Sequence, residues 1–199
     1  MITMKDKQNE IKQFFNERAE KWDNICAYSQ EKIAAIVTLA GITSGSHVAD
    51  IACGTGVMIP EMLSRNPARI LGIDLSEKMI AKAHSKFADS RLQLLAADLF
   101  DVQETGFDTV MIFSAYPHFP DKAKFARQIS GMLKVGGRVM VAHCEGRNSI
   151  NHCHSGSTVS QISWPLRSAQ EEAAEFSGLF NMDMLADTPD IYFFSGVKK

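Results

Sequence analysis

Apolar and polar positions alternate with two different periods along this chain of 199 residues. In the first part, apolar residues recur at the spacing of one helix face over 11–22 and again over 33–40. This pattern predicts a helix over residues 8–40, and Gly41 and Gly45 end it.

After Gly45 the pattern changes to short apolar runs separated by amphipathic helical stretches. The runs have the length of β-strands and lie at 47–52, 69–73, 92–97, 109–113 and 138–142. Helix faces between them are marked by Met79, Ile80, Ala83 and Phe87, and by Phe125, Ile129, Met132 and Leu133. Because parallel neighbours need a long crossover, this alternation predicts a parallel sheet covered by helices.

The last part of the chain predicts a helix and a hairpin. Ser168 and Glu171 have the spacing of a capping box, which starts the helix. Two apolar runs follow at 179–186 and 191–197, and the turn between them is too short for a crossover, so these strands should pair antiparallel. The expected fold class is α/β, a Rossmann-like doubly wound sheet of seven strands, mostly parallel, with an antiparallel C-terminal hairpin.

Composition and charge narrow the class of protein. With 45% hydrophobic and 22% charged residues, the chain is globular rather than disordered. A formal net charge of −2 argues against a dedicated nucleic-acid binder, which needs a surplus of basic groups. No apolar run approaches the roughly 18 residues of a membrane span, and the polar N-terminus shows no signal peptide. Four scattered cysteines do not form a secreted disulfide framework, so we expect a cytoplasmic protein.

The most informative stretch is the turn after the first predicted strand. Asp50 lies in that strand, and Gly54 and Gly56 remove two side chains from the turn, so a ligand can approach the backbone closely. Ligands of open α/β sheets bind beyond the carboxyl ends of the strands, where this turn lies. Ile59 takes the place of the third glycine of a dinucleotide fingerprint, and no Gly-Lys-Ser/Thr is present. These features argue against a dehydrogenase and against a P-loop.

Two further acids lie at the same edge of the predicted sheet. Asp74 ends the second strand, 18 residues past Gly56, and can accept both hydroxyls of a ribose. Asp98 follows the third strand and is placed to meet an adenine amino group. The three strand ends together predict a nucleoside ligand.

These motifs together resemble the class I S-adenosylmethionine-dependent methyltransferases, in particular the small-molecule type of ubiquinone and menaquinone biosynthesis. The resemblance covers residues 14–143 in order and register. It includes the strand and glycine turn at 50–56, the acids after the second and third strands, and the segments 107–113 and 132–139. One departure is Ala52, where the family often has its first glycine.

The resemblance implies S-adenosylmethionine as cofactor and a single domain over 1–199, with a helical N-terminal lid at 1–44 and the core at 45–199. Gly54 and Gly56 would face the methionine moiety, Asp74 the ribose, and Asp98 with Leu99 the adenine. Asp50 would act through the loop, or alternatively only hold the turn. Trp22, on the lid, would help to close the pocket, or alternatively be only a core residue. The full implied cofactor-binding set is Trp22, Asp50, Ala52, Gly54, Gly56, Asp74, Leu75, Met79, Asp98, Leu99 and Phe113.

The acceptor pocket should lie past the fourth and fifth strands. After the fourth, His118 is the first candidate for a general base and Tyr116 for a hydrogen bond to the acceptor; alternatively His118 only holds the loop. After the fifth, His143 is a second catalytic candidate, and Arg147 and His154 are substrate-binding candidates. Two other interpretations of the segment 143–154 are a metal site and a solvated loop. Its His and Cys spacing matches no metal motif, so no metal is expected.

The function these observations favour is methyl transfer to a small-molecule acceptor by in-line displacement. An RNA or protein methyltransferase and a non-catalytic cofactor- or metal-binding module are the alternatives. A metalloid acceptor held by Cys144 and Cys153 is a minor variant. We expect no membrane partner and do not favour nucleic acid as a partner, and the acceptor atom and oligomeric state stay open.

Overall fold

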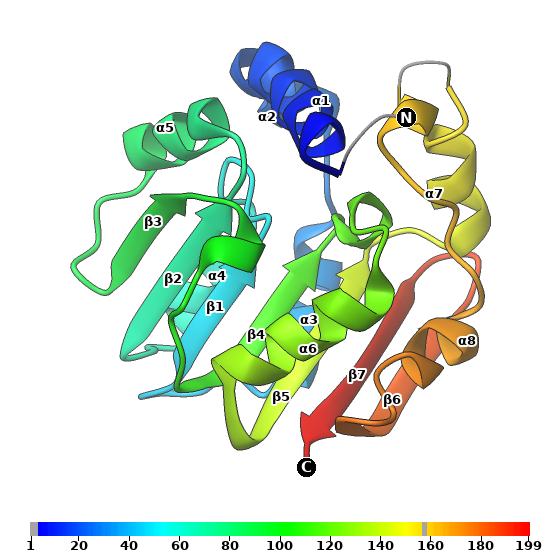
Figure 1. Cartoon of the computed structure of the whole chain (residues 1–199). Helices are drawn as coiled ribbons and strands as arrows, with labels where there is room; N and C mark the ends of the chain where they lie inside the picture. Colours follow the sequence, from blue (N-terminus) through cyan, green and yellow to red (C-terminus); the bar gives the residue numbers. More distant parts are fainter. Residues whose placement is uncertain (1–3, 157–158) are drawn as a thin grey trace.

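The computed structural model describes residues 4–156 and 159–199 (Figure 1). The α-helices are α1 (Met4–Arg18), α2 (Trp22–Ile25), α3 (Gln30–Leu39), α4 (Ile59–Ser64), α5 (Glu77–Lys86), α6 (Lys122–Met132), α7 (Arg147–Cys153) and α8 (Ala169–Ala174). The 3₁₀ helices are η1 (Ala19–Lys21), η2 (Leu99–Asp101), η3 (Tyr116–His118) and η4 (Val159–Gln161). The strands are β1 (His47–Ile51), β2 (Arg69–Asp74), β3 (Leu92–Ala96), β4 (Phe107–Phe113), β5 (Leu133–His143), β6 (Phe180–Asp187) and β7 (Tyr192–Lys198).

The strands form one seven-stranded sheet in the order β3-β2-β1-β4-β5-β7-β6. Strands β1 to β5 pair in parallel, and β7 pairs antiparallel with both β5 and β6. The predicted sheet and its C-terminal hairpin are therefore confirmed. Because the chain runs outward from β1 through β2 to β3 and then returns to β4 on the other side of β1, the direction of winding reverses between β1 and β4. That reversal opens a crevice at the carboxyl ends of the strands.

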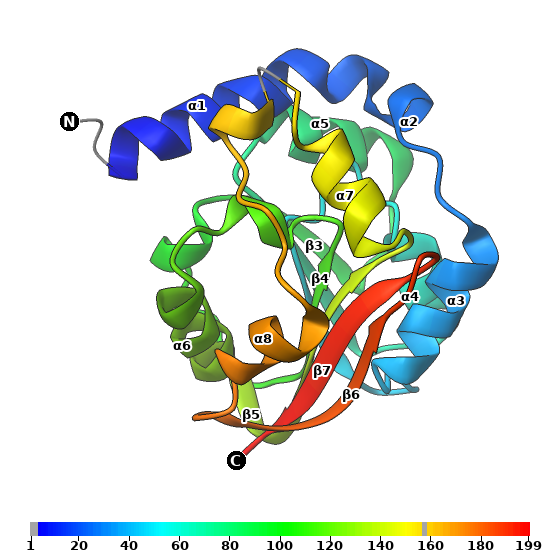
Figure 2. The ribbon, with the colours of Figure 1, turned by 90° about the vertical axis from the view of Figure 1, so that its right-hand side faces the viewer.

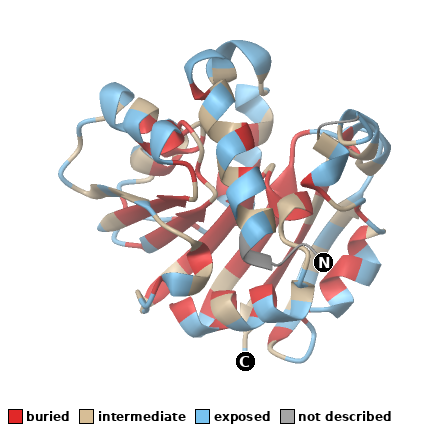
Figure 3. Cartoon of the chain, turned by 45° about the horizontal axis from the view of Figure 1, so that its top comes forward, coloured by how far each residue is buried: buried red, intermediate tan, exposed pale blue. Residues whose placement is uncertain are grey.

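Helices cover both faces of the sheet. On one face, Ile36 of α3 and Met62 of α4 belong to an apolar cluster. On the other face lie α6 and α8, where Phe125 of α6 and Phe176, just after α8, belong to a second cluster (Figure 2). The central strands are accordingly buried along nearly their whole length (Figure 3). Burial on both faces explains why these strands read as continuous apolar runs.

The N-terminal helix expected over 8–40 is interrupted. Residues 26–29 leave the helical conformation, and the Ser29 side chain accepts the backbone N–H of Lys32 to start α3 as a new helix. As a result α1 and α2 lie across the carboxyl edge of the sheet, whereas α3 packs beneath it as part of the core (Figure 1).

Two boundaries differ from the sequence prediction. Strand β5 begins at Leu133, which had been expected on a helix face, because α6 ends at Met132. The long segment between β5 and α8 contains the helix α7. Within the described part of the chain, no helix is both long and apolar enough to cross a membrane.

Candidate functional site

A cavity of about 490 Å³ lies at the carboxyl edge of the sheet and is lined in part by residues of α1 and α2. The ends of β1 to β4 form its floor. Every predicted cofactor residue except Asp50 lines this cavity: Trp22, Ala52, Gly54, Gly56, Asp74, Leu75, Met79, Asp98, Leu99 and Phe113. The sequence motifs therefore converge on one space.

The glycine turn adopts left-handed backbone conformations. Gly54 and Gly56 have φ of 56° and 90°, which glycine adopts without steric cost. A Cβ on Gly56 would lie 2.6 Å from Ile59 Cδ1 and 2.7 Å from Phe87 Cε2, so the turn packs tightly against α4 and α5. Ala52 also has a positive φ, 54°, so the alanine that replaces a glycine there holds a strained conformation beside the cavity.

Asp74 connects the glycine turn to the start of α5. Its Oδ2 accepts the backbone N–H of Gly54 and its Oδ1 accepts that of Ser76, both at 2.8 Å. Burial raises the pKa of this carboxyl to about 6, against the opposing effect of the two N–H donors. The carboxylate keeps lone pairs beyond these two bonds, so its predicted role toward a ribose remains compatible with the geometry.

Asp98 meets a side chain that the sequence did not suggest. Its Oδ1 accepts the backbone N–H of Phe100 at 3.0 Å, and its Oδ2 accepts the amide of Gln8 from α1. Gln8 is polar and on a helix far away in the chain, so nothing in the local pattern marks it. The contact brings α1 over the end of β3.

The segment α2 is attached to the glycine turn by a second unpredicted residue. The Asp23 carboxylate accepts the Thr55 hydroxyl and forms an ion pair with Lys86 at 2.9 Å. Next to it, the Trp22 indole lies 3.9 Å from the position a Cβ on Gly54 would take. Trp22 therefore covers the turn rather than filling the core.

Asp50 lies beneath the turn and does not line the cavity. It is 1% exposed, and its Oδ2 has no hydrogen-bond partner. Burial, together with the charge of Asp74, raises the pKa of the Asp50 carboxyl to about 8. An unpaired buried carboxyl of this kind is held mainly in its neutral form at neutral pH.

This raised pKa predicts a pH dependence of stability. Because the folded pKa is above the unfolded value, the unfolded chain loses this proton first, and the contribution of Asp50 to stability falls as pH rises towards 8. Burial lowers the pKa values of His118 and His143, which act in the opposite direction. The Asp50 contribution is therefore the difference in free energy of unfolding between the unaltered chain and Asp50→Asn, and urea unfolding between pH 6 and 8 should show this difference falling by about 1 kcal/mol per pH unit. Parallel slopes for the two proteins would refute the assignment.

His118 lines the cavity as a neutral imidazole. Its Nδ1–H donates to the carbonyl oxygen of Ile162 at 2.9 Å, which leaves the lone pair on Nε2. Burial lowers the pKa of His118 to about 4. The ring lies edge-on to Phe15, at 5.1 Å between centroids, and to His154, at 5.4 Å.

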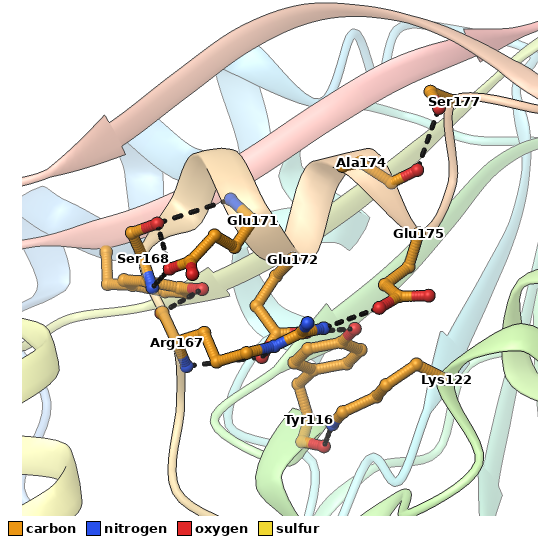
Figure 4. A network of polar contacts seen from close by, with 10 residues as sticks. Tyr116, Lys122, Arg167, Ser168, Glu171, Glu172, Ala174, Glu175 and Ser177 are labelled. Carbon is orange, nitrogen blue, oxygen red and sulfur yellow. Dashed lines mark hydrogen bonds and ion pairs between the residues drawn. The ribbon is translucent and has the colours of Figure 1, made fainter.

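Tyr116 does not reach the cavity, contrary to the sequence prediction. It is fully buried between α6 and α8, and its hydroxyl donates to Glu172 at 3.0 Å (Figure 4). Arg167 pairs with the same carboxylate, and Lys122 donates to the Tyr116 carbonyl oxygen at 2.9 Å. The side chain points into the core because η3 turns the chain back under the sheet edge before His118.

Tyr116→Phe is therefore expected to lower stability without changing ligand binding. The buried Glu172 would lose one donor, which costs about 1–3 kcal/mol. Denaturant unfolding measures the loss. Weaker binding of ligands in the cavity, with stability unchanged, would place Tyr116 at the site after all.

The residues expected beyond the fifth strand also lie outside the cavity lining. His143 is 4% exposed at the end of β5, with Nε2 unpaired and its ring 5.9 Å from Tyr192. Arg147 pairs with Asp187 at 3.2 Å, and His154 donates from Nδ1 to the Ile150 carbonyl oxygen at 2.7 Å. The reason is that α7 is anchored to the β6–β7 turn, where Gly146 N–H donates to the Pro189 carbonyl oxygen. Packing on that turn leaves Arg147 outside the cavity lining, whereas His154 contacts it only through His118.

No metal-binding group of three or more His, Cys, Asp or Glu side chains is found over residues 4–156 and 159–199. Of the two cysteines considered for a metalloid, Cys144 is buried and Cys153 is exposed.

Other cavity residues escaped the sequence analysis. Tyr28 could not be predicted, because it lay inside the expected helix. Ser114 could have been predicted, because it directly follows the fourth strand and ligands bind at the carboxyl ends of strands.

Comparison with known proteins identifies relatives of this chain. Residues 48–137 match the family model described as a methyltransferase domain. The chain is 29% identical over 128 residues to 27-O-demethylrifamycin SV methyltransferase of Amycolatopsis mediterranei, covering 59% of this chain and 47% of that protein. It is 35% identical over 101 residues to ubiquinone biosynthesis O-methyltransferase of Ralstonia nicotianae, covering 48% and 42%. The matched part thus spans less than half the length of these relatives.

The fold also matches solved structures. Magnesium protoporphyrin IX methyltransferase from Synechocystis PCC 6803 superposes with a TM-score of 0.72 at 16% identity, covering 98% of this chain and 100% of that one. At this identity the likeness concerns the fold.

Proposed function

We propose that this chain is a class I S-adenosylmethionine-dependent methyltransferase that transfers a methyl group from S-adenosylmethionine to an oxygen atom of a small molecule. The observation that carries the proposal is one cavity in which the glycine turn, Asp74 and Asp98 lie at the ends of three adjacent strands. The names of the rifamycin and ubiquinone O-methyltransferases support an oxygen acceptor.

The residues of the cavity fit this cofactor. Gly54 and Gly56 leave backbone exposed for its amino-acid end, and Asp74 and Asp98 offer carboxylate oxygens for the ribose and the adenine. When bound, S-adenosylmethionine supplies a methyl group made electrophilic by its sulfonium. The role of the protein is then chiefly alignment, which is worth about 7–11 kcal/mol in well-oriented reactions.

His118 is the residue we propose as general base. Its Nε2 carries the free lone pair, and the Ile162 carbonyl oxygen holds the ring in that tautomer. His118→Gln is expected to reduce kcat by about 10²–10⁴ and to leave cofactor affinity unchanged. Because the pKa of His118 is about 4, the unaltered enzyme should keep its activity down to about that pH. A pH–rate profile with kcat measured for both proteins checks this, and an unchanged kcat would leave His118 with only the loop-holding role.

The proposed function is tested in two steps. Isothermal titration with S-adenosylhomocysteine, the demethylated product, should show one site. Methyl-labelled donor incubated with a cell-extract metabolite pool should then give a labelled product of low molecular mass. Failure to bind the product would end the proposal, and label found only in RNA or protein would replace the acceptor class.

The setting we propose is the cytoplasm. All four cysteines are free, as expected in a reducing compartment. The net charge of −2 gives little support to a nucleic-acid acceptor.

A further inference from the structure

The cavity has a second end that the cofactor motifs do not occupy. The strand order places β2 and β3 on one side of β1 and β4 on the other. From the β4 side the lining includes Phe113, Ser114 and His118, and Cys26 and Tyr28 come from the segment between α2 and α3. We call these five residues the β4 end of the cavity.

Tyr28 is the central polar side chain of the β4 end. Its ring packs edge-on against Phe113 at 5.0 Å between centroids. The polar neighbours of its hydroxyl are the Ser114 hydroxyl and the Cys26 thiol. The β4 end therefore combines aromatic surface with a small group of neutral hydrogen-bonding atoms.

Ser114 turns its side chain into this group through a strained backbone. Its φ is 52°, while its N–H still donates to the Ala142 carbonyl oxygen at 2.9 Å as an extension of the β4–β5 pairing. Non-glycine residues in this conformation occur mainly where the surrounding structure or the function requires it. Here the left-handed turn places Ser114 beside Tyr28.

The β4 end carries no formal charge at neutral pH. Burial raises the pKa values of the Cys26 thiol and the Tyr28 phenol and lowers that of His118, so all three groups are neutral. The charged groups that act on Cys26 and His118 lie outside the β4 end: Glu145 and Lys122 do not line the cavity, and Asp23 is already paired with Lys86 and Thr55. A charged acceptor placed at the β4 end would lose water without gaining a counter-ion, which is unfavourable.

We infer that the β4 end is the acceptor subsite for an uncharged, ring-bearing molecule with a hydroxyl group, and that Tyr28 is a residue that determines this specificity. The ring would pack against Phe113 and Tyr28, and the hydroxyl would exchange hydrogen bonds with Tyr28, Ser114 or His118. This inference rests on the proposed function, because it assigns the other end of the cavity to the cofactor.

The test compares three probes that share one dihydroxylated ring and differ in charge. They are 4-methylcatechol, which is neutral, 3,4-dihydroxybenzoate, an anion, and dopamine, a cation. Each is titrated calorimetrically at pH 7 into the full chain saturated with S-adenosylhomocysteine. The neutral probe is expected to bind at least about tenfold more tightly than either ion, because the ions lose hydration without a partner.

Two variants locate the binding. Tyr28→Phe removes only the hydroxyl and should weaken 4-methylcatechol binding by about fivefold. Tyr192→Phe is the matched control, because the Tyr192 hydroxyl donates to the Arg167 carbonyl oxygen outside the cavity. This variant should leave the affinity for 4-methylcatechol unchanged. Ser114→Asp adds a charge at a position where aspartate tolerates a positive φ. It should make dopamine the tightest of the three probes.

Each remaining outcome overturns the inference. An ion that binds the unaltered chain as tightly as the neutral probe removes the charge argument. Equal effects of Tyr28→Phe and the control remove the role of Tyr28. Binding of S-adenosylhomocysteine with no binding of any probe refutes the acceptor class and leaves the proposed function standing, whereas absence of S-adenosylhomocysteine binding refutes the proposed function itself.

Discussion

Asp74→Asn is expected to weaken S-adenosylhomocysteine binding by at least about a hundredfold, which corresponds to the loss of two hydrogen bonds to a charged group. The carboxylate holds the glycine turn through Gly54 and the start of α5 through Ser76. Asparagine has one side-chain oxygen, which can accept only one of these two N–H groups, and its NH₂ would face the other N–H donor. The turn would lose its connection to α5, and a bound ribose would lose its acceptor.

Stability should change much less than binding in this variant. Losing an N–H acceptor destabilises the fold, but removing a carboxylate whose pKa is raised by burial offsets part of that loss. The matched control is Asp108→Asn at the opposite edge of the sheet. There the carboxylate accepts the His47 N–H at 2.8 Å and pairs with Lys134. Calorimetry should show unchanged binding for this control, and equal losses in both variants would mean a general effect on folding.

Gly56→Ala should damage both stability and binding. The position has a φ of 90°, and the added Cβ would meet Ile59 and Phe87 at 2.6 Å and 2.7 Å. Backbone strain and overpacking together are expected to lower the free energy of unfolding by about 2–4 kcal/mol. Movement of the turn to relieve the contact should also reduce S-adenosylhomocysteine affinity, because the turn forms the cavity floor.

Gly45→Ala separates these two causes. Gly45 has a similar φ of 83°, but nothing lies within 4 Å of its Cβ position, and it does not line the cavity. This variant should lose only the strain contribution, about 1–2 kcal/mol, and should bind normally. Chemical unfolding and calorimetry of both variants give the comparison. Equal stability losses would show that crowding at Gly56 is unimportant.

The meeting of the predicted cofactor residues in one cavity was predictable because each of them belongs to a local motif. Gly54, Gly56, Asp74 and Asp98 all lie at or just after strand ends, and parallel strands bring their carboxyl ends to one edge. The methyltransferase resemblance inferred from these motifs is confirmed by the match over residues 48–137. The seven-stranded sheet followed for a similar reason, since continuous apolar runs and crossover lengths are properties of short stretches.

Most residues predicted for the acceptor lie outside the cavity lining, because proximity in sequence does not specify direction in space. Tyr116 and His118 are two residues apart, yet one points into the core towards Glu172 and the other into the cavity. His143 is buried as the last residue of β5, and Arg147 is held by Asp187 at the end of β6. Tyr28 and Gln8 reach the cavity from helices and loops that pair with distant strand ends.

Periodicity, strand ends and glycine spacing were thus sufficient for the fold and for bringing the predicted cofactor residues to one cavity, since each arises from residues that are neighbours in the chain. The β4 end of the cavity depends instead on which side chains the segment between α2 and α3 and the helix η3 turn towards β4. That choice results from packing between segments far apart in sequence, such as Tyr28 with Phe113, and became visible only once the chain was folded.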